Sequence, residues 1–153
     1  MNSHETAARR LMIPALRALY DPFAPYAYAL MRFCTGAVIV PHGYTKLFGG
    51  AIGAAAGSIA KLGLEPASAW AYLVGVVEFA GGIMLAIGLL ARLAAAALVI
   101  EFAVIVFAVK YASGFFAFRG GFEYELLLGL LCIAIFFKGS GRFSVDHSIG
   151  REL

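Results

Sequence analysis

Long apolar runs separated by short polar breaks dominate the chain, and four of these runs are long enough to cross a lipid bilayer. They cover about residues 26–47, 69–90, 93–111 and 122–137. At a rise of about 1.5 Å per residue, roughly 20 residues span the hydrocarbon core, and backbone groups in lipid must be satisfied within the segment. The pattern therefore predicts an all-α membrane protein built as a four-transmembrane-helix bundle.

The polar breaks carry the residues that start and stop helices. Asp21-Pro22 and Pro25 precede the first run, Glu65-Pro66 precedes the second, and "KGSGR" ends the fourth. Residues 49–67 are rich in Gly and Ala and too short to cross, which predicts a surface loop with a short helix; a lid lying on the bundle is the alternative. Residues 9–20 place arginines on one helical face and apolar side chains on another, which predicts a short N-terminal interfacial helix. A frayed basic tail remains the alternative.

Composition supports the membrane assignment. Of the 153 residues, 62% are hydrophobic and only 14% are charged, and the mean hydropathy is +0.88. Soluble domains have about 25% charged residues, so a single integral membrane domain over 1–153 is expected. The net charge of +3 forms no basic patch with interleaved aromatic residues, which argues against a nucleic-acid partner. Cys34 and Cys132 lie in apolar runs without a CxxC motif, which leaves open both a redox pair and apolar packing.

The positions of Lys and Arg predict the orientation in the membrane. With four spans, both termini share one side, and the basic residues divide seven to four in favour of that side. Cytoplasmic loops carry the excess of Lys and Arg, so both termini are expected in the cytoplasm. The seven are Arg9, Arg10, Arg17, Arg92, Lys138, Arg142 and Arg151, and the four are Lys46, Lys61, Lys110 and Arg119.

Ionisable side chains inside the spans are the strongest functional signal, because each one costs roughly 2.5–3.5 kcal/mol to insert. In the first span, polar and small residues recur at three- and four-residue steps, which places them on one stripe facing the bundle interior. The stripe consists of Arg32, Thr35, Gly36, Ile39, His42, Gly43 and Lys46.

Depths counted along the spans predict which side chains meet. His42, Glu78 and Glu125 fall at similar depth and are expected to form a polar cluster in the outer half of the bundle, with Tyr44 and Lys46 at its rim. Arg32 is expected to pair with Glu101 deeper on the cytoplasmic side. Each of these residues also has a purely structural interpretation, such as fixing helix register or snorkelling to the headgroups. The sequence holds no HxxH or ExxH spacing, so no metal site is predicted.

Three stretches resemble the DoxX family over about residues 29–146. They are "MRFCTGAVIVPHGYTKLFGG", "KLGLEPASAWAYLVGVVEFAGGIMLAIGLLARLAA" and "GFEYELLLGLLCIAIFFKGSGRFSVD". The resemblance implies a small four-helix protein of the bacterial inner membrane, with Arg32 and Glu78 at characteristic family positions. The family takes its name from a subunit of a thiosulfate:quinone oxidoreductase, and some members are linked to redox and oxidative-stress complexes.

Three functions follow as expectations. The first is a redox-linked membrane subunit of a quinone-linked oxidoreductase. Its polar pocket would bind a quinone, and its electrons would come from a soluble or membrane redox partner protein. Here His42 would donate a proton and Glu78 would relay protons. The second is a non-enzymatic anchor or assembly scaffold for a soluble oxidoreductase. The third is a small-molecule or proton transporter, and a homo-oligomer stays open. No cofactor is expected in the chain itself apart from a bound quinone.

Overall fold

The computed structural model describes residues 12–151, which form helices and no strand. The α-helices are α1 (Arg17–Tyr20), α2 (Ala24–Leu47), α3 (Ile52–Ala60), α4 (Ala67–Ile87), α5 (Ala91–Val104), α6 (Glu123–Lys138) and α7 (Val145–Ile149). Helix α5 continues as a π-helix over Ile105–Lys110, and short 3-10 turns cover Pro14–Leu16, Tyr111–Ser113 and Ala117–Arg119.

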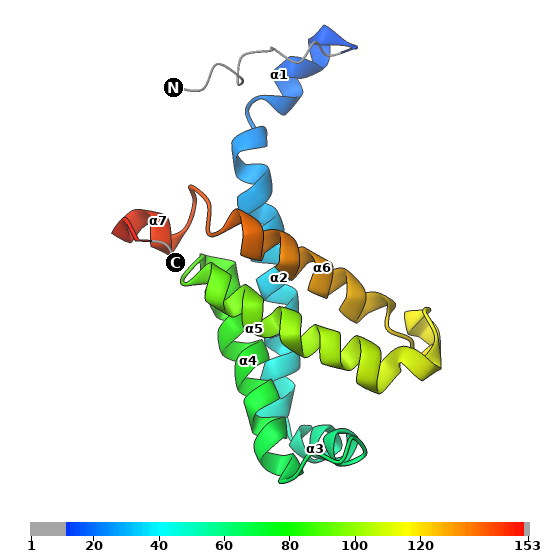
Figure 1. The fold of residues 1–153 in the computed structure, drawn as a ribbon. Coiled ribbons are helices and arrows are strands. Elements are labelled where there is room, and N and C mark those ends of the chain that lie inside the picture. Colours follow the sequence, from blue (N-terminus) through cyan, green and yellow to red (C-terminus); the bar gives the residue numbers. More distant parts are fainter. Residues whose placement is uncertain (1–11, 152–153) are drawn as a thin grey trace.

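The long helices form two pairs (Figure 1). Helix α2 packs mainly on α4, and α5 packs mainly on α6. The two pairs meet near the α4–α5 turn and diverge away from it, so that α5 and α6 lead toward the loop before α6 while α4 leads back to α3. Helix α3 packs against α4, and α7 lies near the α4–α5 turn.

Length and composition identify the membrane-crossing candidates among the described residues. Helix α4 and the continuous helix Ala91–Ser113 are each long and apolar enough to cross a bilayer. The segments Pro14–Tyr20 and Ala24–Leu47 qualify together as a third candidate, bent by 50°. Helix α6 has 16 residues, which is shorter than the roughly 20 that a bilayer core requires. The structure therefore supports two or three crossing helices.

The short helix expected within residues 49–67 is present as α3. Of the predicted interfacial helix over 9–20, residues 9–11 lie outside the described part of the chain, and the remainder forms the turn Pro14–Leu16 followed by α1. Pro41 lies inside α2, which continues through it to Leu47.

Glycines bring α2 and α4 into direct backbone contact. A Cβ on Gly36 would lie 2.3 Å from the carbonyl oxygen of Gly82, and a Cβ on Gly43 would lie 2.3 Å from the amide nitrogen of Phe79. Small residues allow this close approach between membrane helices. The glycines on the polar stripe of α2 therefore fix the side chains between them relative to α4.

The apolar core lies between the two helix pairs on the side of the α4–α5 turn. Leu85, Leu98, Cys132 and Ile135 are fully buried there. Cys34 is exposed on α2 whereas Cys132 is in this core, and both are free thiols, so the structure does not bring the two cysteines together as a redox pair. Further from the turn the helix pairs separate, and the core gives way to a cavity.

Candidate functional site

A cavity of about 570 Å³ lies where the two helix pairs diverge. Residues of α2, α3, α4, α5, the π-helix and α6 line it, and most of the lining is apolar. Buried core residues Ile39, Phe102 and Leu128 form part of its wall. The polar lining residues are His42, Lys46, Ser58, Glu78, Glu101, Lys110, Tyr124 and Glu125.

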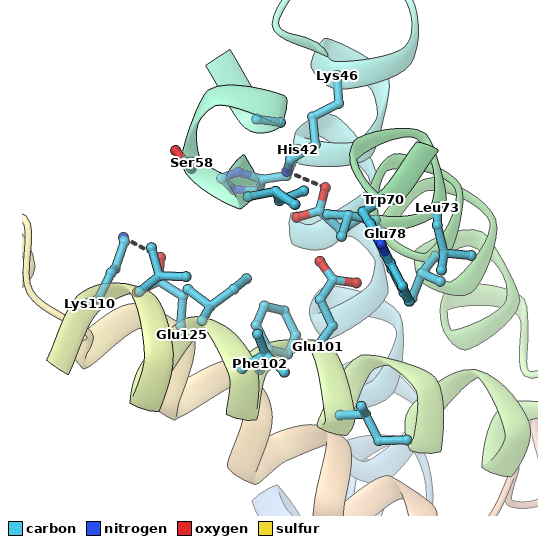
Figure 2. A pocket seen from close by; sticks show the side chains of 18 of the residues that line it. His42, Lys46, Ser58, Trp70, Leu73, Glu78, Glu101, Phe102, Lys110 and Glu125 are labelled. Atoms are coloured by element: carbon cyan, nitrogen blue, oxygen red, sulfur yellow. Dashed lines mark hydrogen bonds and ion pairs between the residues drawn. The ribbon is translucent and has the colours of Figure 1, made fainter. Parts of the chain in front are cut away.

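Lys46 and Glu78 form an ion pair across the α2–α4 interface (Figure 2). The Glu78 side chain is 6% exposed and the Lys46 side chain 21%. Opposite charges at close range stabilise each other's charged forms, and more strongly where water is excluded. This pair therefore places two opposite charges in contact inside an otherwise apolar region.

Lys110 and Glu125 form a second ion pair, with 2.5 Å between Nζ and Oε1. Lys110 ends the π-helix, and Glu125 lies in the first turn of α6. A π-helical segment inside an α-helix is rare and frequently occurs at functional sites. It rotates the end of the helix relative to an ideal α-helix, and Lys110 in this position reaches α6.

Glu101 is buried without a partner. The residue is 9% exposed, and neither carboxylate oxygen has a hydrogen-bond partner among the described residues. Figure 2 shows its carboxylate pointing from α5 toward Glu78 of α4. The strongest electrostatic effect of another side chain on Glu101 comes from Glu78, and Lys46 acts in the opposite sense. The two carboxylates therefore face each other, and neither Glu101 oxygen makes a hydrogen bond within the part of the chain that the structure describes.

His42 and Tyr124 meet on another part of the lining. The Nε2 atom of His42 lies 3.4 Å from the hydroxyl oxygen of Tyr124, and the ring centroids are 5.7 Å apart. His42 is exposed in the structure, so it lies on the open side of the cavity. Both side chains can donate or accept a hydrogen bond to a bound molecule.

The structure places five of the seven sequence-predicted site residues on the cavity lining: His42, Lys46, Glu78, Glu101 and Glu125. Tyr44 is not on this lining and packs instead against Phe48 and Phe79, with ring centroids 5.4 and 6.4 Å away. Glu78 and Glu125 each contact a lysine rather than forming a direct cluster with His42.

The predicted pairing of Arg32 with Glu101 is wrong. The Arg32 guanidinium donates hydrogen bonds to the carbonyl oxygens of Leu85, Ala86 (3.1 Å) and Phe143 (2.6 Å). The last carbonyls of a helix lack intrahelical partners and carry partial negative charge. Arg32 therefore caps the C-terminal end of α4, on the far side of the core from Glu101.

Asp146 completes this arrangement from the C-terminal segment. It is 1% exposed, and its carboxylate accepts hydrogen bonds from Ser140 and from the backbone N–H groups of Leu90 (2.8 Å) and Ala91 (3.3 Å). Burial alone would raise the pKa of Asp146, but these hydrogen bonds and the positive charge of Arg32 together lower it below its ordinary value. Asp146 thus caps the N-terminal end of α5 as Arg32 caps α4.

Sequence reasoning missed Lys110, Tyr124 and Asp146. Lys110 counted only as a basic residue in the orientation argument, and Tyr124 received no role. Tyr124 and Leu128 are four residues apart, so they share a face of α6, and this spacing was the available signal. Nothing local predicts that Asp146 caps a helix that begins at residue 91.

The comparisons with known proteins give one match. The family model described as DoxX matches residues 27–111, more than half of the chain. This region covers α2 to α5 and includes Arg32, His42, Lys46, Glu78 and Glu101. Comparison with curated proteins and with solved structures gives no match.

Proposed function

This chain belongs to the DoxX family, and we propose that it is a membrane subunit that binds a lipid-soluble ligand of the quinone class in the cavity between its two helix pairs. The observation that supports this proposal is the composition of the cavity wall, in which a few ionisable side chains lie among many apolar ones. Ligand pockets of about 300–1,000 Å³ with this composition bind small amphipathic molecules.

The arrangement of the lining suits a polar head and an apolar tail. Glu78, Glu101 and Lys46 provide hydrogen-bonding groups beside the α2–α4 interface, and His42 with Tyr124 provides a second set. The apolar lining residues Leu73 and Ile100 are 51% and 67% exposed, so the wall continues onto the outer surface of the helices. In a bilayer, a ligand tail would leave the cavity along this apolar wall.

In this proposal the protein positions the ligand and exchanges protons with it, while electrons come from a partner redox protein. His42 and Tyr124 can each transfer a proton at a ligand oxygen, because both carry exchangeable protons. The ion pair with Lys46 holds the Glu78 side chain in place beside the α2–α4 interface.

The proposal includes four membrane crossings, by α2, α4, the continuous helix from Ala91, and α6. The four helices pack on one another through the shared core, and the aromatic residues of the preceding loop extend α6 toward the headgroup region. The excess of Lys and Arg on the side of the termini favours both termini in the cytoplasm, and membership of the DoxX family favours a bacterial inner membrane.

The test is ligand retention by a cavity-filled variant. The protein is purified in mild detergent, and the lipid-soluble molecules bound to it are extracted and analysed. A short-tailed quinone is then titrated into purified protein from which these molecules have been removed. Ala97 lines the cavity, whereas Ala103 on the same helix is exposed and not part of the lining. We expect Ala97→Phe to lose quinone binding and Ala103→Phe to keep it.

Equal binding in the two variants, or none in the wild type, would contradict the proposal. A wild-type protein that carries a partner oxidoreductase through purification but binds no quinone would favour the scaffold function instead. Proton or solute flux in liposomes would favour the transporter.

A further inference from the structure

Among the described residues of the cavity lining, Glu101 is the acidic side chain without a partner. Lys46 pairs with Glu78 and Lys110 pairs with Glu125, while both oxygens of Glu101 lack a hydrogen-bond partner. The lining therefore carries three carboxylates against two ammonium groups. The excess acidic group is Glu101.

Glu101 also lies where an uncompensated charge is most costly. The residue is 9% exposed and borders the apolar core at Phe102. In protein interiors, the ionised form of a carboxyl group without a counter-ion is strongly disfavoured relative to the neutral form. The titratable groups that face it or share its cavity are His42 and Lys46 of α2, Glu78 of α4, Lys110, and Tyr124, Glu125 and Cys132 of α6.

The neighbouring pair decides which carboxylate needs compensation. Lys46 contacts Glu78 directly and acts on Glu101 only from a greater distance. When two carboxylates lie close together, one proton relieves their repulsion, and it resides on the one that lacks a cation. By this geometry the proton belongs to Glu101.

We propose that Glu101 is a protonated hydrogen-bond donor in the cavity and that it recognises a head group that accepts hydrogen bonds, such as the carbonyl of an oxidised quinone. This inference rests on the proposed function, because the head group binds in the same cavity. Without a ligand, the carboxyl group of Glu101 points toward Glu78. A bound carbonyl oxygen accepts a hydrogen bond from the protonated Glu101, and no covalent bond changes.

The experiment compares wild type, Glu101→Gln and Glu101→Leu in lipid nanodiscs, with a short-tailed quinone as the probe and its affinity measured over a range of pH. An amide has a donor where the protonated acid has one, so Glu101→Gln should keep the affinity seen at neutral pH. Glu101→Leu should lose roughly tenfold, the value of one hydrogen bond. Wild-type affinity should fall as the pH rises and Glu101 ionises, and that of Glu101→Gln should stay constant.

Infrared difference spectroscopy gives a readout that does not require the ligand. The carbonyl-stretch band of a protonated carboxylic acid should be present in the wild type at neutral pH. It should be missing in Glu101→Gln and retained in Glu123→Gln, since Glu123 is exposed at the start of α6. Variants are compared only after size-exclusion chromatography shows each one to be monodisperse.

The outcomes separate this inference from the function on which it rests. Equal quinone affinity in all three proteins at every pH overturns the role of Glu101 and leaves the proposed function in place. An unchanged infrared band in Glu101→Gln overturns the protonation of Glu101. Absence of quinone binding by the wild type overturns the proposed function, and the ligand role of Glu101 with it.

Discussion

The α4–α5 turn and the cavity are two buried polar regions of the same helix pairs, and their charged side chains have different kinds of partner. At the α4–α5 turn, Arg32, Ser140 and Asp146 form what we name the turn cluster. Arg32 caps the carbonyl end of α4 and Asp146 caps the amide end of α5. In the cavity, the charged side chains contact one another across helices instead.

The difference indicates which region can take part in chemistry. The turn cluster uses its charges on backbone groups at helix ends, so removing Arg32 or Asp146 leaves helix ends unsatisfied. The cavity pairs two carboxylates with two lysines and leaves Glu101 without a partner. Charges that bind helix ends stabilise the fold, whereas a buried carboxylate without a partner that faces a cavity is available to a ligand.

The largest effect is expected from Arg32→Met. Loss of the guanidinium leaves carbonyls of α4 and Phe143 without a donor and Asp146 without its cation. We expect a loss of about 3 kcal/mol in the free energy of unfolding, measured in mixed micelles of mild detergent and SDS. Quinone affinity of the folded fraction should not change, and a selective loss of affinity with full stability would place Arg32 with the cavity.

Gly88→Ala tests the turn cluster through its backbone. Gly88 has φ +73°, and an added Cβ would lie 2.4 Å from Nη1 of Arg32 and 2.5 Å from Cβ of Ser144. Strain and steric clash together should cost about 2–3 kcal/mol. Gly63 has φ +74° with open space around it. Gly63→Ala should therefore cost only about 1 kcal/mol, and equal losses in the two variants would show that backbone strain alone matters at Gly88.

Asp146→Asn separates the turn cluster from the cavity by pH. The pKa of Asp146 is lower in the folded protein than in the unfolded chain, so its ionised form stabilises the fold at pH above the ordinary value of about 4. This stability should disappear as the pH falls through the folded pKa. We expect the thermal midpoint of the wild type to fall in this acidic range, with a smaller fall in Asp146→Asn.

Asp21→Asn is the matched control for that measurement. The Asp21 side chain is 69% exposed, and its Oδ2 atom lies 3.9 Å from Nε of Arg17. Exposed pairs contribute little, so this variant should keep the acid sensitivity of the wild type. If Asp21→Asn also lost the acid sensitivity, the acid sensitivity of the wild type would come from surface charge rather than from the turn cluster.

Local pattern was sufficient to predict the four long helices but not α7, the π-helix or all of the helices' partners. The apolar runs predicted 26–47, 69–90, 93–111 and 122–137, and the structure has α2, α4, α5 with its continuation, and α6 close to these ranges. Apolar length determines where a helix forms in lipid, whereas membrane crossing by all four remains a prediction, since α6 has only 16 residues.

Helical periodicity predicted the part of the candidate site that lies on α2. The three- and four-residue steps in α2 placed His42 and Lys46 on the face that lines the cavity. Depth counting failed for Arg32, because it assumes that a buried cation pairs with a buried anion. Helix ends offer backbone partners that no residue count reveals, and the capping of α5 by Asp146 depends on the tertiary fold.

In the cavity, Glu78→Gln should have a smaller effect than any change in the turn cluster. Glu101 lies beside Glu78 and within the field of Lys46, so it can replace Glu78 as the partner of the lysine. We expect a loss below about 1 kcal/mol for Glu78→Gln alone. The double variant Glu78→Gln/Glu101→Gln should lose more than the sum of the two single variants, because Lys46 then has neither carboxylate. Additive losses would contradict this exchange of partners.

The smallest effect is expected at the second ion pair. The side chains of Lys110 and Glu125 are 33% and 13% exposed, so water weakens their attraction. A double-mutant cycle with Lys110→Met and Glu125→Gln should give a coupling energy of about 0.5–1 kcal/mol in the free energy of unfolding. Raising the salt concentration should reduce it, since exposed pairs are screened. A coupling as large as the loss expected for Arg32→Met would mean that the fold of the π-helix depends on this pair. The cavity would then be as structural as the turn cluster, and the contrast between the two regions would be wrong.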